Sequence, residues 1–258
     1  MRIKEIIYLL FIVLIFNCAG NNVISDDLES SLNKGIELFN DKKYSKARDK
    51  FEFIIYNNPG STFALKAQYY FAESLYMLEN YESASREYDK FVMLSQDSEL
   101  VARSKFLICK CLYQLSHDYN KDQDNTKFTI DKIQYFLEEY PNTSHKDECE
   151  DMITVLRSKL ALKEIESGKL YLRLEKYDSA LLYFNLILIE YYDTPYYDDA
   201  LFYIILTYVL DNQLEKAEEF LNNNNNNFIT EQKLEDSKQI IIDSKQNNKI
   251  KYFFNLIK

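Results

Sequence analysis

The sequence predicts an all-α fold, a solenoid of about five stacked helix pairs followed by capping helices at the C-terminal end. Three observations predict it. A small residue recurs with an alanine twelve positions later and a bulky side chain four further on, most clearly at Gly35, Ala47 and Phe51. Hydrophobic residues make up 47% of the chain and recur at the spacing of one helix face. The chain contains 4 glycines, too few for hairpins or nucleotide-binding loops.

The position of this residue recurs at a nearly fixed period. Gly35, Ala72 and Cys109 are spaced 37 residues apart, and Gly168 and Ile205 are again 37 apart. This is close to the period of a tetratricopeptide repeat, roughly 34 residues, in which each unit is a pair of antiparallel helices. We therefore expect a tetratricopeptide-repeat superhelix. In each unit the small residue would let the two helices approach closely, with the alanine opposite it.

The order of elements follows from this period and from the composition of both ends of the chain. All three prolines fall near the expected ends of second helices, where the chain must turn. We expect a signal peptide at 1–17, a lipidated cysteine and tether at 18–27, repeats one to three at 28–144, repeats four and five at 145–221, and an asparagine-rich turn with closing helices at 222–258.

The first eighteen residues have the pattern of a bacterial secretion signal. Arg2 and Lys4 precede an apolar run from Ile6 to Phe16, and that run is too short for a membrane-spanning helix, which needs about 20 residues. Cys18 follows directly. The segment Leu14-Ile15-Phe16-Asn17-Cys18 resembles a lipoprotein cleavage box, in which the cysteine becomes the lipidated N-terminus. The alternative is an ordinary secreted protein with an incidental cysteine.

The residues after Cys18 indicate where such an anchor would go. Ala19-Gly20 lacks the aspartate that retains lipoproteins in the inner membrane of enteric bacteria. By this resemblance we expect the lipid to anchor the chain in the outer membrane, facing the periplasm.

The third repeat is longer than the others. The gap between Cys109 and Gly168 is 59 residues, so about 22 residues are inserted there. A solvated polar loop and a long helix account for the extra length. The expected elements are the loop over 116–125, a second helix from about Thr126 to Glu139, and a helix of nearly thirty residues from about Lys146 to Leu174.

These features, in this order, resemble the BamD family, the tetratricopeptide lipoproteins of the machine that assembles outer-membrane β-barrels. The resemblance covers roughly residues 18–221 and rests on the lipoprotein start, the five units and three local motifs. The motifs are Asp122-Gln123-Asp124, the joint Tyr140-Pro141-Asn142-Thr143, and the helix Leu156-Arg157-x-x-Leu160-Ala161-x-x-Glu164.

The resemblance implies a lipid-anchored periplasmic scaffold that carries out no bond chemistry. Its first half would receive unfolded outer-membrane proteins, and its second half would dock the barrel-forming, BamA-like subunit. The competing interpretation is another repeat lipoprotein, such as a secretin pilotin or a coordinator of the cell envelope or of division.

Candidate binding residues follow from the geometry of such a superhelix, whose first helices line an inner surface. Positions counted from each small residue give an aromatic surface that suits an extended peptide. The predicted peptide-binding residues are Leu32, Ile36, Phe39, Tyr69, Glu73, Tyr76, Phe106 and Tyr113. The resemblance implies a second, partner-binding set in the second half: Asp198, Asp199, Phe202, Leu206 and Val209. For both sets the alternative is packing between neighbouring helices.

Composition argues against several classes of function. The formal net charge of −10 repels nucleic acid. The chain has no GxSxG, phosphate-loop or HExxH motif, so we expect neither an enzyme nor a cofactor. Two histidines, His117 and His145, are too few for a metal site without other ligands, and we expect both to be solvated.

The remaining cysteines and the C-terminal region leave alternatives open. Cys109 occupies a small-residue position, so we expect a buried thiol there. Cys109 and Cys111 point to different faces of a helix, but a disulfide from either to Cys149 stays possible in the periplasm. The six asparagines at 222–227 are of low complexity. Closing helices are expected after them, because a solenoid must cover its last apolar face; a partner-binding tail is the alternative.

Overall fold

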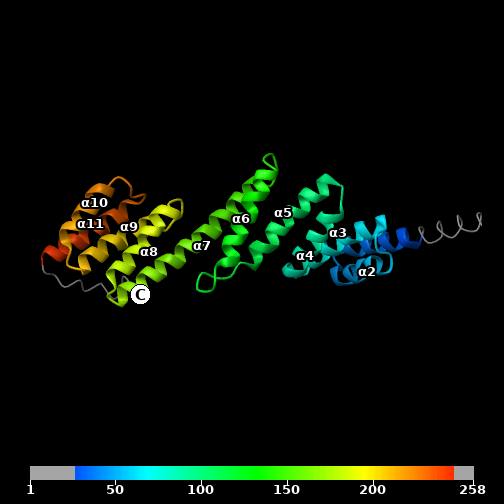
Figure 1. Cartoon of the computed structure of the whole chain (residues 1–258), viewed down its shortest axis with the longest axis horizontal. Coiled ribbons are helices and arrows are strands. Elements are labelled where there is room, and N and C mark those ends of the chain that lie inside the picture. Colours follow the sequence, from blue (N-terminus) through cyan, green and yellow to red (C-terminus); the bar gives the residue numbers. More distant parts are fainter. Residues whose placement is uncertain (1–26, 247–258) are drawn as a thin grey trace, which may run out of the picture. The chain divides into compact units, whose positions relative to one another are not determined.

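The computed structural model describes residues 27–246, and every regular element within them is a helix (Figure 1). This confirms the predicted all-α tetratricopeptide-repeat class. A first helix over 27–40 is followed by α2 (Tyr44–Asn57), α3 (Thr62–Met77), α4 (Tyr81–Leu94), α5 (Ser98–Leu115), α6 (Asp124–Glu139), α7 (Lys146–Arg173), α8 (Tyr177–Glu190), α9 (Tyr197–Leu210), α10 (Leu214–Asn224) and α11 (Glu231–Lys245). The predicted signal peptide, Cys18 and the last part of the predicted closing region lie outside the described residues.

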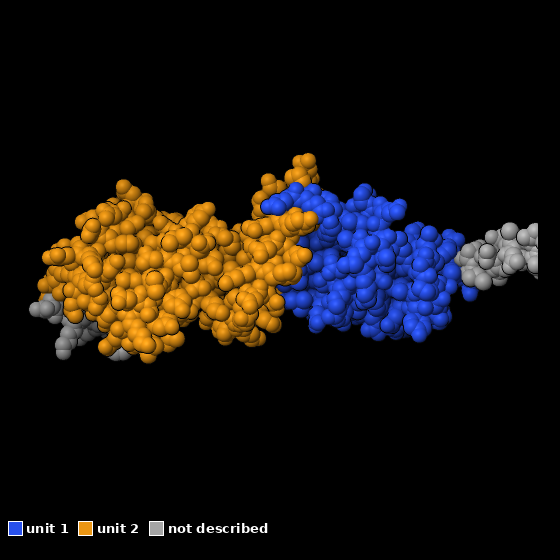
Figure 2. Space-filling model, viewed as in Figure 1, with its two compact units in different colours: residues 1–115, 138–140 blue, residues 116–137, 141–258 orange. Residues whose placement is uncertain are grey.

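The helices form two compact units, which are coloured separately in Figure 2. Of the described residues, the first unit contains 27–115 and 138–140, and the second contains 116–137 and 141–246. The boundary therefore falls within the third repeat, so that α5 belongs to the first unit and most of α6 to the second. The sequence-based division after residue 144 groups whole repeats, and it stays a prediction.

Four turns between paired helices share one backbone geometry. Each has a non-glycine residue in the left-handed region, with φ between 55° and 61°, at Lys42, Glu79, Glu175 and Asn212. The following N–H then bonds to the carbonyl five residues back, as from Lys43 to Leu38 at 2.9 Å. This geometry satisfies carbonyl groups at the end of the first helix, which would otherwise lack a partner. Every such pair therefore turns at the same point of its repeat.

Two glycines set the close approach of helices within a pair, as the repeat pattern predicts. A Cβ atom added to Gly35 would lie 2.6 Å from the ring of Phe51, and one added to Gly168 would lie 2.4 Å from the ring of Phe184. Both rings are fully buried. Phe51 stacks on Tyr70, and Phe184 stacks on Tyr203. Both tyrosines belong to the first helix of the following repeat, α3 and α9. Each joint thus connects one repeat to the next within its unit.

The loop before α6 is organised by a buried glutamine. Gln123 is buried, and its Nε2 donates to the backbone carbonyls of Asp118 at 2.7 Å and Lys121 at 3.1 Å. Its Oε1 accepts a hydrogen bond from Thr126 Oγ1 at 2.8 Å. The prediction of a solvated loop is therefore wrong at Gln123, because its amide satisfies the loop's backbone from the inside.

Two lysines of α7 hold the same loop against that helix. Lys159 Nζ donates to Ser116 Oγ at 2.9 Å and to the Ser116 carbonyl at 3.2 Å, and Lys163 Nζ donates to the Lys121 carbonyl at 2.9 Å. Burial lowers the pKa of Lys159. The inserted segment is therefore fixed to α7 within the second unit.

Arg157 ties α7 to the turn between α8 and α9. Its Nη2 and Nε donate to the two carboxylate oxygens of Asp193 at 2.7 Å and 2.9 Å, and Nη2 also donates to the carbonyl of Glu190. The Arg157 hydrogen bond is the main reason that the pKa of Asp193 is lowered. This contact explains structurally why an arginine lies in the Leu156–Glu164 motif.

Replacing Arg157 by methionine is expected to lower the free energy of unfolding by about 1 kcal/mol at pH 7. The lowered pKa of Asp193 means that this contribution is present above the unfolded-state pKa, near 4, and is lost as pH falls through the folded-state pKa. Urea unfolding of both proteins at pH 7 and pH 3 measures the effect. An equal difference between the two proteins at both pH values would contradict the assigned ion pair.

Candidate protein-binding surfaces

Four of the eight predicted peptide-binding residues are buried in the first unit: Leu32, Tyr69, Glu73 and Phe106. The expectation that these positions are exposed is wrong. Tyr69 shows the reason, because it points toward the second helix of its own pair and packs edge-on against Phe91, with ring centroids 5.3 Å apart. These four side chains therefore lie mainly inside the unit.

The other four predicted residues remain partly exposed: Ile36, Phe39, Tyr76 and Tyr113. Phe39 packs edge-on against Tyr44 at 5.3 Å, and Tyr76 does the same against Tyr81 at 5.5 Å. In each case the partner is the first residue of the next helix, so the contact spans the turn between the two helices. The rest of each side chain stays accessible to a bound segment.

A buried charge network lies behind this surface. Tyr69 Oη donates to Glu73 Oε1 at 2.5 Å, and Arg103 Nη2 lies 3.4 Å from the same oxygen. Burial raises the pKa of Tyr69 and of Tyr88, and the hydroxyl of Tyr88 is buried without a hydrogen-bond partner. The side chain of Arg103 is 59% exposed. The network thus holds a cation at the surface of an acidic protein.

Arg103 was not among the residues predicted from the sequence. A signal for it exists in principle, because a buried carboxylate such as Glu73 requires a cationic or hydrogen-bonding partner. The partner lies thirty positions further along the chain, and nothing in the local spacing identifies it.

An apolar groove in the first unit was also not predicted. It has a volume of about 320 Å³, near the lower end of the range for ligand pockets. An adjoining hollow of about 350 Å³ shares Thr62 and Leu65 with it. The groove is lined by Thr62, Leu65, Lys66, Tyr69, Tyr70, Phe91, Ser95, Asp97 and Leu100. Such a lining can take up apolar side chains of another polypeptide.

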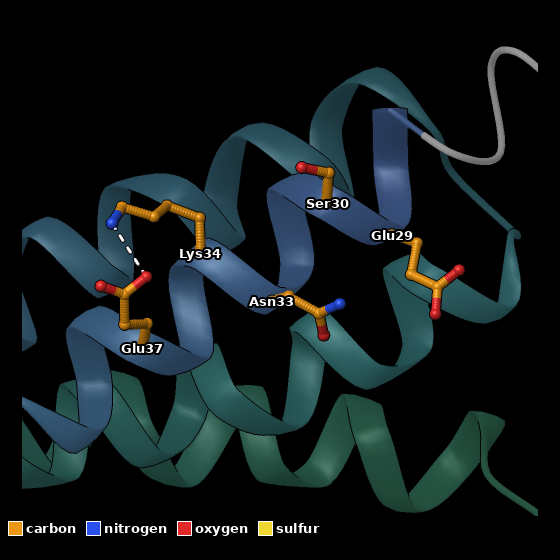
Figure 3. A pocket seen from close by; sticks show the side chains of 5 residues that line it. All are labelled: Glu29, Ser30, Asn33, Lys34 and Glu37. Carbon is orange, nitrogen blue, oxygen red and sulfur yellow. Dashed lines mark hydrogen bonds and ion pairs between the residues drawn. The ribbon is translucent and has the colours of Figure 1, made fainter.

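A hollow of a different kind lies along the first helix (Figure 3). It measures about 510 Å³ and is lined by Glu29, Ser30, Asn33, Lys34 and Glu37, all of them polar. Lys34 Nζ pairs with Glu37 Oε2 at 2.8 Å across one helix turn. This lining offers no apolar burial, so we interpret it as a solvated helix face.

The predicted partner-binding residues of the second half are mostly internal. Asp198, Phe202, Leu206 and Val209 are buried, and Asp199 is half-buried. The apolar members belong to a core that α9 shares with α10 and α11. The expectation that all five face a partner is therefore not met, because the chain's own helices cover them.

The closing helix α11 is held on α9 by two adjacent aspartates. The carboxylate of Asp198 accepts hydrogen bonds from the backbone N–H groups of Ile229 at 2.9 Å and Thr230 at 2.7 Å, and from Thr230 Oγ1 at 2.7 Å. Asp199 pairs with Lys233 at 2.6 Å. Asp198 thus satisfies backbone groups at the start of α11.

The three cysteines of the described residues, Cys109, Cys111 and Cys149, are present as buried thiols. Burial raises the pKa of Cys111 to about 12 and that of Cys149 to about 11. Both therefore stay protonated at neutral pH, where a thiol is a poor nucleophile. The disulfide that the sequence left open is not formed.

Thiol titration of a Cys18→Ser variant checks this assignment. We expect Ellman's reagent at pH 8 to react with no thiol of the native protein and with all three remaining thiols in urea, because burial blocks both access and ionisation. Rapid reaction in the native state, or fewer than three thiols in urea without reductant, would contradict buried thiols.

Neither a metal centre nor a spanning segment is found in the part of the chain that the structure describes. No three residues of the metal-binding types His, Cys, Asp and Glu lie close enough together within 27–246 to hold an ion. The helices of this range all fall short of the length and apolarity that a bilayer crossing requires.

Comparison with known proteins identifies the family. The family model YfiO, described as outer membrane lipoprotein, matches residues 27–223. The chain is 27% identical over 200 residues to the outer membrane protein assembly factor BamD of Rickettsia prowazekii, covering 78% of this chain and 80% of that protein. It is 22% identical over 184 residues to BamD of Caulobacter vibrioides, covering 71% of this chain and 60% of that protein.

Two solved structures are similar at lower sequence identity. YrrB, a tetratricopeptide protein with an unusual peptide-binding site, matches 84% of this chain and 90% of its own, with 16% identity and a TM-score of 0.34. The TPR2AB domain of yeast Sti1, in a complex with pHSP90, matches 90% and 99%, with 11% identity and a TM-score of 0.43. The family assignment therefore rests on the sequence matches, which span well over half of the chain. The two BamD relatives agree with it. The chain belongs to the YfiO family of outer membrane lipoproteins.

Proposed function

We propose that this chain is a lipid-anchored periplasmic scaffold for the assembly of outer-membrane β-barrel proteins, and that it is not an enzyme. The observation that carries the proposal is the match to assembly factors over most of the chain. Two accessible features of the first unit support it, namely the partly exposed predicted side chains and the apolar groove, because both suit contact with a polypeptide. The alternative is a repeat scaffold of another envelope machine.

The client site, in this proposal, lies in the first unit. It combines the four partly exposed side chains Ile36, Phe39, Tyr76 and Tyr113 with the apolar groove beside α3. An unfolded barrel strand alternates apolar and polar residues, so its apolar side chains can enter such a groove in turn. Burial contributes about 25 cal/mol per Å² before the cost of ordering the client is subtracted. Weak, reversible holding is the expected result.

The other proposed partners are the barrel-forming, BamA-like subunit and the outer membrane itself. The subunit would contact the second unit, where Asp199 remains partly exposed. The membrane contact would be the lipid on Cys18. Nucleic acid is not a partner in this proposal, because the net charge of −10 opposes it.

The anchor is tested by a Cys18→Ser variant expressed in full length. Without the lipid, the protein is expected in the soluble periplasmic fraction, while the wild type fractionates with outer membranes. Continued membrane fractionation of the variant after a high-salt wash would rule out Cys18 as the anchor.

The client site is tested by the double variant Leu65→Gln/Leu100→Gln, which makes two groove side chains polar. Fluorescence anisotropy with a labelled, barrel-strand peptide is expected to show binding weakened about fivefold or more, which corresponds to about 1 kcal/mol. Met93→Gln is the matched control, because Met93 is highly exposed and lies outside the groove. Equal affinity of all three proteins, with unchanged circular dichroism, would place the client site elsewhere.

A further inference from the structure

The outer face of α8 carries three exposed aliphatic side chains in a straight line. Leu182, Leu186 and Ile189 are 73%, 36% and 68% exposed. Their spacing of i, i+4 and i+7 places them on one helix face over two full turns. Tyr192, just after the helix, is also exposed. A contiguous apolar patch of this kind marks an interaction site more often than scattered apolar residues do.

The other repeats provide an internal comparison. The second helices α2, α4, α8 and α10 share the same inner positions, a buried alanine and a bulky residue four further on, such as Ala84 and Tyr88 of α4. We call Leu182, Leu186 and Ile189 the α8 stripe. The corresponding outer positions in α4 are Arg86, Lys90 and Met93. Arg86 and Lys90 form ion pairs with Glu82 and Glu87 of their own helix.

The helices α10 and α2 likewise show that these outer positions need not be aliphatic. In α10 they are Glu219 and Asn223, and in α2 the first of them is Asp49, followed by the aromatic residues Phe53 and Tyr56. An unbroken aliphatic stripe therefore is no consequence of the repeat fold. Its presence on α8 requires a separate explanation.

The charges on α8 identify the chemistry of the occupant. Within α8 itself the charged residues are Asp178 in the first turn and Glu190 at the end, both exposed, and the exposed Lys176 lies just before the helix. A second copy of α8 laid against the first would bring these acidic residues together. An anionic lipid surface would be repelled for the same reason. The charges favour a partner that carries lysine or arginine.

The shape of the stripe identifies the form of the occupant. A helix offers no unpaired backbone N–H or C=O groups along its side, so an extended strand gains no main-chain hydrogen bonds there. A second helix with apolar residues at the same i, i+3/i+4, i+7 spacing packs its side chains between those of α8. We infer that α8 is a docking face for an amphipathic helix of another protein, with an aliphatic seam flanked by lysine or arginine.

This inference adds an interaction to the proposed function and does not depend on the client site. The probe is a helical peptide of about 21 residues with leucine at the seam positions, made in one form with lysine flanks and in a second form with glutamate flanks. We expect the lysine form to bind the full chain at least about tenfold more tightly than the glutamate form, with weaker binding at higher salt.

The matched variant transfers the α4 residues to α8, as Leu182→Arg/Leu186→Lys. These residues already occupy the corresponding places of a folded repeat, so the protein is expected to keep its circular dichroism spectrum. We expect it to lose binding of the lysine-flanked peptide about tenfold or more, while Phe53→Lys, the equivalent outer change in α2, leaves binding unchanged. Retained binding by the α8 variant, or equal binding of both peptides by wild type, would overturn the inference.

Photo-crosslinking in cells identifies the natural occupant and separates this inference from the proposed function. A photoreactive amino acid at Ile189 is expected to label a lysine- or arginine-flanked helix of another protein. The same amino acid at Met93, the equivalent place in α4, is expected to give no such adduct. Adducts at Ile189 only with a second copy, with residues 247–258 or with lipid would contradict the inference. Retained client-peptide binding in the α8 variant would then show that the proposed function stands without it.

Discussion

Gly168→Ala is expected to destabilise the second unit by about 1–3 kcal/mol, the usual cost of overpacking a core. The sign is informative, because alanine in place of a helical glycine ordinarily stabilises by about 0.5–1 kcal/mol. Here the added Cβ would lie 2.4 Å from a ring carbon of Phe184. That ring is fully buried and stacks on Tyr203 with ring centroids 5.2 Å apart, so moving it would disturb the core.

The measurement is urea unfolding followed by circular dichroism, with the double variant Gly168→Ala/Phe184→Leu as the control. Leucine is smaller than phenylalanine, so the two changes are expected to cost less together than the sum of their separate effects. A Gly168→Ala protein at least as stable as wild type would show that the helices are not held at this distance.

Asp198→Ala is expected to release α11 from α9, with a loss of about 3 kcal/mol or more for three hydrogen bonds to one buried carboxylate. The change removes the acceptor for two backbone N–H groups and the hydroxyl of Thr230. Amide hydrogen exchange across α11 (Glu231–Lys245) should accelerate far more than exchange in α7.

Asp199→Ala is the matched control for Asp198→Ala. The neighbouring aspartate forms a partly exposed ion pair with Lys233, and such pairs contribute about 0–1 kcal/mol. If both variants lost the same stability, or if exchange in α11 were unchanged in Asp198→Ala, the assigned role of Asp198 would be wrong.

The repeat pattern was enough to predict the fold, because it reports contacts that every unit must make. Gly35 and Gly168 approach Phe51 and Phe184 as the pattern requires, and the long helix α7 (Lys146–Arg173) lies within one residue of its predicted bounds. A small residue, an alanine and a bulky residue at fixed spacing define a joint between two helices. Such local chemistry can be read along a single chain.

Exposure could not be predicted in the same way. The offsets that selected Tyr69 and Glu73 identify a helix face, but they do not tell how deeply neighbouring side chains cover it. Glu73 is buried against Arg103, thirty residues away. Likewise the sequence of α9 is apolar on almost every side. Such a helix is expected to be buried, but the pattern does not say by what. Only the structure shows that α10 and α11 of the same chain cover it.

The central claim, that the chain is a scaffold of outer-membrane barrel assembly, is tested most directly by purifying the anchored full-length protein. An affinity tag after residue 258 and a mild detergent would allow quantitative mass spectrometry of the complex. The account predicts a barrel-forming, BamA-like subunit in near-stoichiometric amount, in wild type and in the Leu65→Gln/Leu100→Gln variant alike. Recovery of a secretin or of division proteins in its place, with no barrel-forming subunit, would contradict it.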